Sequence, residues 1–73
     1  MNKKLKVGIV GYGVVGKRRR FFIDQHLNLQ TVAVCDQDFK SSGRMPDGVK
    51  FFSTYNELLK ENLDIVFVSV PNY

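Results

Sequence analysis

The sequence predicts an α/β domain with a partial, doubly wound parallel sheet, and three observations lead to this class. Short apolar runs rich in β-branched residues recur along the 73-residue chain, separated by segments of helical periodicity. The runs contain few polar positions, which is typical of strands covered on both faces of a parallel sheet. Strands that alternate with helical segments imply parallel pairing through right-handed crossovers.

The first strand and the first helix are separated by a glycine-rich break. The apolar run Lys6–Val10 predicts a buried strand, and residues 11–13 (Gly-Tyr-Gly) end it. A helix is expected over Val14–Leu27, with Asn28 as its stop because asparagine tolerates the left-handed conformation. The apolar side of this helix is expected to comprise Val14, Val15, Phe21, Phe22, Ile23 and His26.

The second strand is expected over Gln30–Asp36, which is rich in β-branched residues and ends in an acid. Residues Phe39–Gly48 contain two serines, two glycines, a proline and an aspartate. This composition predicts an irregular connection in place of a helix.

A short third strand is expected over Val49–Ser53, near an edge of the sheet. Thr54 and Glu57 have the spacing of a capping box, in which the hydroxyl and the carboxylate satisfy backbone donors of the first helical turn. A second helix is therefore predicted from Ser53 or Thr54 through Asn62.

The break after the first strand has the pattern G-x-G-x-x-G and opens a helix. Gly11 permits the tight turn, Gly13 allows a pyrophosphate to approach the backbone, and Gly16 allows the helix to pack closely on the sheet. The helix start offers unpaired N–H groups and the positive end of its dipole to phosphates. A dinucleotide is expected to contact Gly11, Tyr12, Gly13, Val14, Val15 and Gly16.

Asp36 is the second expected contact, because a carboxylate at the end of the second strand accepts hydrogen bonds from the adenosine ribose. The same charge repels a 2′-phosphate, which favours NAD over NADP as the cofactor. Lys40 and Arg44 follow on the irregular connection and leave NADP open. The ring of Tyr12 is expected to project toward the nucleotide or to cover it.

The run Asp64–Val70 is the most apolar strand and completes a partial Rossmann sheet with the strand order 3-2-1-4. In this order the first and fourth strands flank the crevice in which ligands bind. Pro71 and Asn72 are therefore expected to lie opposite Gly11 and Gly13, near the middle of a bound dinucleotide.

Composition excludes several other classes. Hydrophobic residues make up 44% and charged residues 25% of the chain, and no apolar run approaches the ~18 residues of a membrane span. The amino terminus has no apolar leader, so we expect a cytoplasmic protein without a membrane partner. Cys35 and His26 are the only cysteine and histidine, which predicts neither a disulfide nor a metal site.

The net charge of +4 comes largely from the run Lys17–Arg20. Such runs are usually solvated, so nucleic acid is not expected as a partner. Contact of Lys17 or Arg18 with the pyrophosphate remains open.

Four segments together resemble the amino-terminal part of the Gfo/Idh/MocA oxidoreductases, which include glucose–fructose oxidoreductase and inositol dehydrogenase. They are residues 6–17 (KVGIVGYGVVGK), 26–38 (HLNLQTVAVCDQD), 51–59 (FFSTYNELL) and 63–72 (LDIVFVSVPN). The resemblance spans nearly the whole chain. The irregular stretch after Asp36 and the basic run depart from the commoner pattern.

The resemblance implies a nicotinamide-dependent dehydrogenase acting on a sugar, cyclitol or sugar derivative, and a homo-oligomer. It also implies that residues 1–73 are a truncated NAD(P)-binding Rossmann domain. The family's substrate domain, with its catalytic lysine in a Glu-Lys-Pro motif and a later histidine, would lie beyond Tyr73. No catalytic residue is therefore assigned here, and the chain alone is expected to have no turnover. A regulatory NAD-sensing module remains the alternative function.

Overall fold

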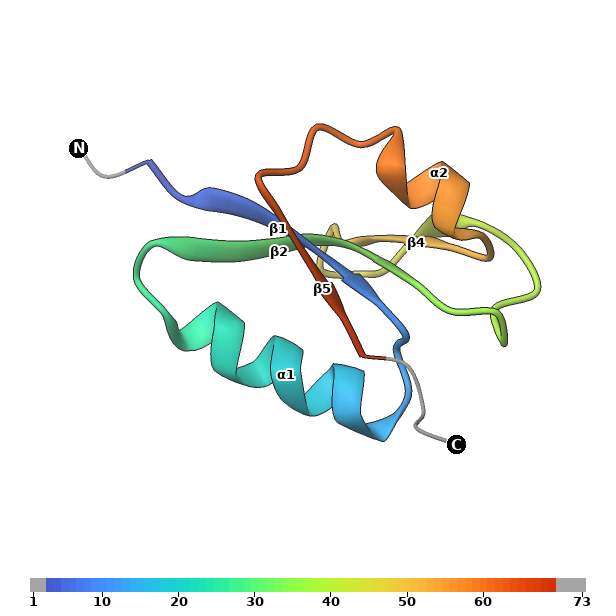
Figure 1. Ribbon diagram of the computed structural model, residues 1–73, viewed down its shortest axis with the longest axis horizontal. Helices are drawn as coiled ribbons and strands as arrows, with labels where there is room; N and C mark the ends of the chain where they lie inside the picture. The colour runs from blue at the N-terminus through green and yellow to red at the C-terminus, as the bar shows by residue number, and fades with distance from the viewer. Residues whose placement is uncertain (1–2, 70–73) are drawn as a thin grey trace.

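The computed structural model describes residues 3–69, which form one five-stranded, mostly parallel sheet with a helix against each face (Figure 1). The sheet order is β3-β4-β2-β1-β5. The elements in chain order are β1 (Leu5–Val10), α1 (Val14–Gln25), β2 (Leu29–Cys35), β3 (Gly43–Arg44), β4 (Lys50–Phe52), α2 (Tyr55–Leu59) and β5 (Ile65–Val68).

The predicted fold class and the predicted strand order are confirmed. β1 lies in the middle and pairs in parallel with β2 on one side and β5 on the other, and β4 pairs in parallel with β2. The four parallel strands thus follow the order 3-2-1-4. Because these strands are parallel, their carboxyl ends all lie at the same end of the sheet.

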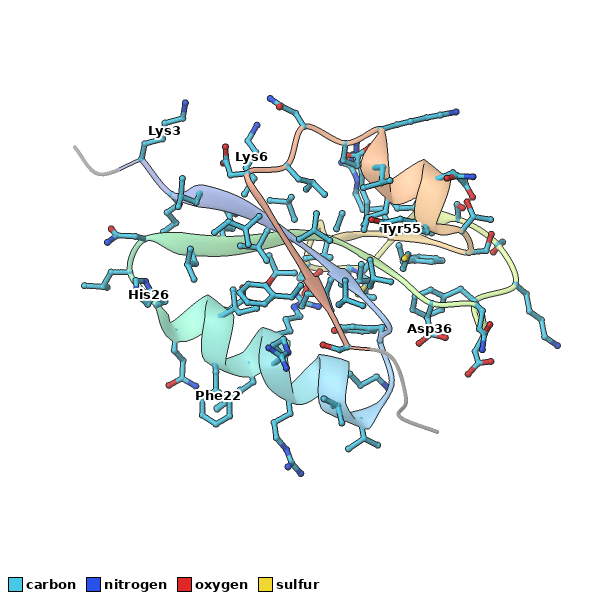
Figure 2. All side chains as sticks on the ribbon, in the orientation of Figure 1. Lys3, Lys6, Phe22, His26, Asp36 and Tyr55 are labelled. Atoms are coloured by element: carbon cyan, nitrogen blue, oxygen red, sulfur yellow. The ribbon has the colours of Figure 1, made fainter. Side chains whose placement is uncertain are left out.

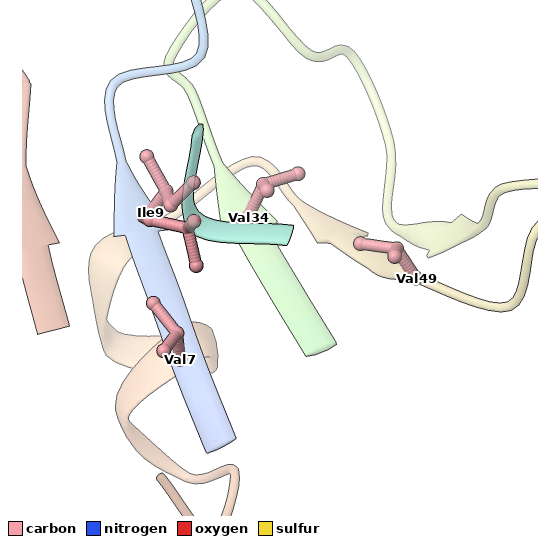
Figure 3. Close-up of a cluster of buried hydrophobic side chains, with 5 residues drawn as sticks. Val7, Ile9, Val34 and Val49 are labelled. Carbon is pink, nitrogen blue, oxygen red and sulfur yellow. The ribbon is translucent and has the colours of Figure 1, made fainter. Parts of the chain in front are cut away.

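Two small clusters of buried side chains hold the helices on the sheet. On the face of α1, Ile23 packs with four valine and isoleucine side chains of the sheet and its loops. Figure 3 shows this cluster, in which Val7, Ile9, Val34 and Val49 are labelled. On the face of α2, the fully buried Leu58 packs on Ala33 and Cys35. Each helix therefore depends on one fully or nearly buried aliphatic anchor.

The predicted apolar side of α1 is confirmed at Ile23 and wrong at its other positions. Gly16 and Ile23 are its buried residues, whereas Val15 and Phe22 are 59% and 63% exposed. Phe22 points away from the sheet (Figure 2). A Cβ at Gly16 would overlap the carbonyl oxygen of Gly11, so the helix must turn this residue toward the sheet. At about 100° per residue, Phe22 is then rotated out into solvent.

The end of α1 also differs from the expectation. The helix ends at Gln25, two residues before Leu27, and His26 is its C-cap in place of Asn28. His26 donates its backbone N–H to Ile23 O at 3.0 Å, and its Nδ1 accepts from the N–H of Asn28 at 3.1 Å. These local bonds turn the chain toward β2 earlier than the sequence pattern indicates.

The connection between β2 and β4 contains no helix, as expected, but it includes the unpredicted strand β3. This two-residue strand pairs antiparallel with β4, and a Cβ at Gly43 would lie 2.9 Å from the ring of Phe51. Glycine at position 43 therefore allows β3 to pair opposite Phe51 without overlap with its ring. Such a short pairing has no detectable signal in the sequence.

The capping of α2 by the Thr54 hydroxyl is confirmed, but the Glu57 carboxylate accepts from the hydroxyls of Thr54 and Ser42 in place of a backbone donor, and the helix ends at Leu59 and not at Asn62. Thr54 Oγ1 accepts from the N–H of Glu57 at 3.3 Å and donates to Glu57 Oε1 at 2.9 Å. After the helix, Leu63 packs within 2.6 Å of the Cβ position that Gly8 lacks. That contact draws the chain back to the sheet and shortens the helix.

Candidate functional site

The carboxyl ends of the four parallel strands open into a cleft of about 520 Å³. The residue that directly follows each strand contributes to its wall: Ser53 after β4, Asp36 after β2, Gly11 after β1 and Ser69 after β5. The other lining residues are Gly13, Val14, Val15, Cys35, Gln37, Asp38 and Tyr55.

The glycine turn has the geometry that the motif predicts. Gly11 has a φ of +90°, in the left-handed region that side chains rarely adopt, and its N–H donates to Cys35 O at 2.8 Å. A Cβ at Gly13 would meet no atom of residues 3–69 within 4 Å, so among these residues Gly13 faces open space in the cleft. Gly16 lies outside the cleft wall and serves the close packing of α1 on β1.

The start of α1 is open to an anion. Its N-cap is Gly13, which offers no side-chain hydrogen bond, and its first turn holds no acidic residue. Within the described residues, the first N–H groups and the positive end of the 12-residue helix therefore lie beside the cleft without a side-chain cap. Val14 and Val15 line the cleft beside these groups.

The carboxylate of Asp36 is held in place by two backbone donors. Its Oδ2 accepts from the N–H of Tyr12 at 2.6 Å, and its Oδ1 accepts from the N–H of Asp38 at 2.8 Å. Each carboxylate oxygen has a further lone pair for a hydroxyl donor. Asp36 therefore joins the end of β2 to the glycine turn and still presents acceptors to the cleft.

The expectation for the ring of Tyr12 is wrong. The ring does not line the cleft but packs against the core on the side of α1, with its centroid 6.2 Å from that of Phe39. Its hydroxyl accepts from Arg20 Nη1 at 2.9 Å. Because the Tyr12 side chain is held by Arg20 and Phe39 outside the cleft, Tyr12 contributes to the site through its backbone N–H, which binds Asp36.

None of the four residues Lys17–Arg20 lines the cleft. Arg20 instead forms an ion-pair network: its guanidinium bonds to Tyr12, to Asp24 Oδ2 at 3.2 Å, and to Asp47. Burial opposes the charge of Arg20, but the hydrogen bonds that its guanidinium donates to Tyr12, Asp47 and Asp24 outweigh burial and raise the pKa of Arg20. This side chain secures the loop before β4 to α1.

Cleft residues that sequence reasoning missed include Ser53, Tyr55 and Ser69. Ser69 is only 9% exposed, and its Oγ has no hydrogen-bond partner within residues 3–69. The missed signal is positional, because each serine is the first residue after a parallel strand. Cys35 also reaches the cleft wall, where burial raises the pKa of its thiol and so disfavours the reactive thiolate.

Two predicted contacts, Pro71 and Asn72, lie outside the described residues. Across the described part of the chain, neither helix is long and apolar enough to cross a bilayer. Residues 3–69 also contain no group of three or more histidine, cysteine or acidic side chains that could hold a metal ion.

Within residues 3–69, these features fit a dinucleotide: a glycine with open space beside it, a helix start without a side-chain cap, a fixed carboxylate and a buried serine hydroxyl without a partner. The fold and the cleft define a nucleotide-binding Rossmann domain. Residues 5–73 match the family model described as the oxidoreductase family with an NAD-binding Rossmann fold, and the chain belongs to this Gfo/Idh/MocA family. No individual curated protein matches the chain.

Proposed function

We propose that the cleft binds NAD in an extended form across the ends of the strands. The adenosine ribose bonds to Asp36, the pyrophosphate lies over Gly11 and Gly13 at the start of α1, and the nicotinamide half extends toward Ser69. Pro71 and Asn72 would continue that side. The observation that carries this proposal is the hydrogen bond from Tyr12 N–H to Asp36 Oδ2, because it fixes the ribose acceptor to the phosphate turn.

The charges around Asp36 favour NAD over NADP. The carboxylate faces the cleft, where a 2′-phosphate would be repelled. Arg44 lies in β3 and lines a separate hollow with Lys6 and Glu61, and the exposed Lys40 does not contribute to the cleft wall. No lysine or arginine lines the cleft within the described residues, so nothing there balances an additional phosphate.

For the reaction, we propose the class that the family resemblance implies: oxidation of a sugar, cyclitol or sugar derivative. NAD supplies the chemistry, as the acceptor of a hydride at C4 of its nicotinamide. The residues of this chain bind and orient the cofactor. Within residues 3–69 the carboxylates of the cleft wall, Asp36 and Asp38, both follow β2, away from Ser69 and the proposed nicotinamide half, so we propose that this chain alone has no turnover. Dehydrogenase activity of the 73-residue chain would contradict this part of the proposal.

Calorimetric titration of the chain with NAD and with NADP tests the site. NAD should bind more tightly than NADP, and Asp36→Ala should weaken NAD binding by about tenfold, since hydrogen bonds to a charged group are lost. Asp36→Asn should reduce the preference for NAD over NADP.

Asp64 provides a matched control. Its Oδ2 accepts from the N–H of Lys6 at 2.7 Å, much as Asp36 binds Tyr12, but it lies at the other end of β1. Asp64→Ala should therefore change stability without changing NAD affinity. Equal loss of NAD binding in both variants, or no NAD binding by the wild-type chain, would refute the proposed site.

A further inference from the structure

The strand order gives the cleft a direction. Asp36 follows β2 and Gly11 follows β1, so a ribose on Asp36 and a pyrophosphate over Gly11 set the axis of a bound dinucleotide. The base attached to that ribose must continue away from β1, toward the next strand of the sheet. That strand is β4, and the residues after it are Ser53, Thr54 and Tyr55.

Tyr55 presents a free aromatic surface at this place. It is 48% exposed, lines the cleft, and belongs to neither buried cluster. Within residues 3–69 its ring has no aromatic partner and its hydroxyl no hydrogen bond to another side chain. Figure 2 shows Tyr55 and Asp36 toward the same end of the molecule, with His26 at the other.

The start of α2 fixes the backbone of Tyr55. The preceding residue, Thr54, caps the helix through its reciprocal bonds with Glu57, and the fully buried Leu58 anchors the helix on the sheet. The Cα of Tyr55 is therefore held beside the cleft, while its half-exposed ring belongs to neither buried cluster and is accessible to a ligand.

We propose that Tyr55 is the adenine-binding wall of the cleft, where its ring stacks on the base of the dinucleotide. This inference rests on the proposed function. Aromatic side chains stack on nucleic-acid bases because every base has a π-face, and the contact excludes water from both surfaces. Tyr55 then favours ligands that carry a base, while Asp36 selects the ribose hydroxyls.

Binding measurements on Tyr55 variants test the inference. Tyr55→Ala should weaken binding of NAD and of adenosine diphosphate ribose by about tenfold each, and Tyr55→Phe should keep both affinities. Tyr55→Leu, which keeps apolar bulk at the start of α2 but has no π-face, should resemble Tyr55→Ala. Leu59→Ala is the matched control, because Leu59 is also 48% exposed on α2 but lies outside the cleft wall.

Proton NMR supplies a readout that a merely structural role would not change. The tyrosine ring signals that disappear in Tyr55→Phe should move upfield when adenosine diphosphate ribose is added to the wild-type chain, and should stay in place with ribose 5-phosphate. Unchanged NAD affinity in Tyr55→Ala and Tyr55→Leu, beside a loss in Asp36→Ala, would overturn the inference and leave the proposed function standing. No NAD binding by the wild-type chain would refute both.

Discussion

Substitutions at two glycines of the turn should have different effects: Gly16→Ala should lower the stability of the fold, and Gly13→Ala should lower its affinity for NAD. In Gly16→Ala the new Cβ would overlap the carbonyl oxygen of Gly11 and lie 3.7 Å from Ile9 Cγ2, so α1 must move away from β1. Overpacking of this kind costs about 1–3 kcal/mol. The cost should lie at the upper end of this range, because the overlapped atoms belong to the backbone of Gly11, which cannot move as freely as a side chain. Replacing glycine within a helix returns about 1 kcal/mol, which leaves a net loss of about 2 kcal/mol.

Urea unfolding followed by circular dichroism measures this loss. With a slope of about 1 kcal/mol per M for a small protein, the midpoint of Gly16→Ala should fall by about 2 M. A domain of this size has only about 3–5 kcal/mol of stability, so the change is a large part of the total. A midpoint equal to that of the wild-type chain would refute the packing role of Gly16.

Gly13→Ala is the matched variant. Its Cβ would meet no atom of the described residues within 4 Å, and its φ of −82° suits alanine, so the weaker N-cap preference of alanine is the cost expected there. That preference costs less than about 1 kcal/mol. The methyl group would occupy the space over which the pyrophosphate is proposed to lie, and NAD affinity should fall by at least about tenfold. Retained affinity would place the phosphate elsewhere.

Three further predictions concern the fold. Arg20→Met removes the ion-pair network and should lower the free energy of unfolding by about 1–2 kcal/mol in urea titrations. The loss is limited to this size because the partners Asp24 and Asp47 are partly exposed, and an unchanged free energy would show that the network does not stabilise the fold. The hydrogen bond from Thr54 and then that from Ser42 hold the pKa of Glu57 below its ordinary value of 4.5, so its stabilisation is present above that pH and lost on further acidification. Urea midpoints across this range should fall less steeply in Glu57→Gln. The edge strand β5, with Val68 59% exposed, should pair with a second copy, and sedimentation showing a monomer at high concentration would contradict this.

The fold was predictable because it depends on signals that are local in the sequence. Apolar runs mark the four parallel strands, the glycine pattern marks the start of α1, and the Thr54–Glu57 spacing marks the start of α2. The handedness of crossovers and the tight turn at Gly11 then leave few arrangements of the sheet.

The directions of side chains were less predictable because they depend on contacts between distant residues. The rotation of α1 about its axis is set by the close packing of Gly16 on the Gly11 carbonyl. This contact leaves the two phenylalanines of the helix exposed, although the sequence pattern places them on its apolar side. The ring of Tyr12 turns inward because Arg20, eight residues later, offers a partly buried donor to its hydroxyl. Neither contact produces a hydrophobic periodicity that can be recognised in the sequence.

The site itself follows from a division of backbone donors between two anions. The Tyr12 N–H binds the Asp36 carboxylate, which leaves the N–H groups at the start of α1 for the proposed pyrophosphate. Because no lysine or arginine lines the cleft within residues 3–69, the proposed complex would balance the phosphate charge with fixed dipoles of the backbone.

This division predicts how salt should affect binding. Mobile ions screen the attraction of exposed cationic side chains over a Debye length of about 8–10 Å, whereas hydrogen bonds from a helix start act at contact distance. NAD affinity should therefore change less than about threefold between 0.05 and 0.5 M salt, as an order of magnitude. A steeper fall, abolished by Lys17→Ala or Arg18→Ala, would show that the basic run of α1 holds the phosphates and that the backbone is not sufficient.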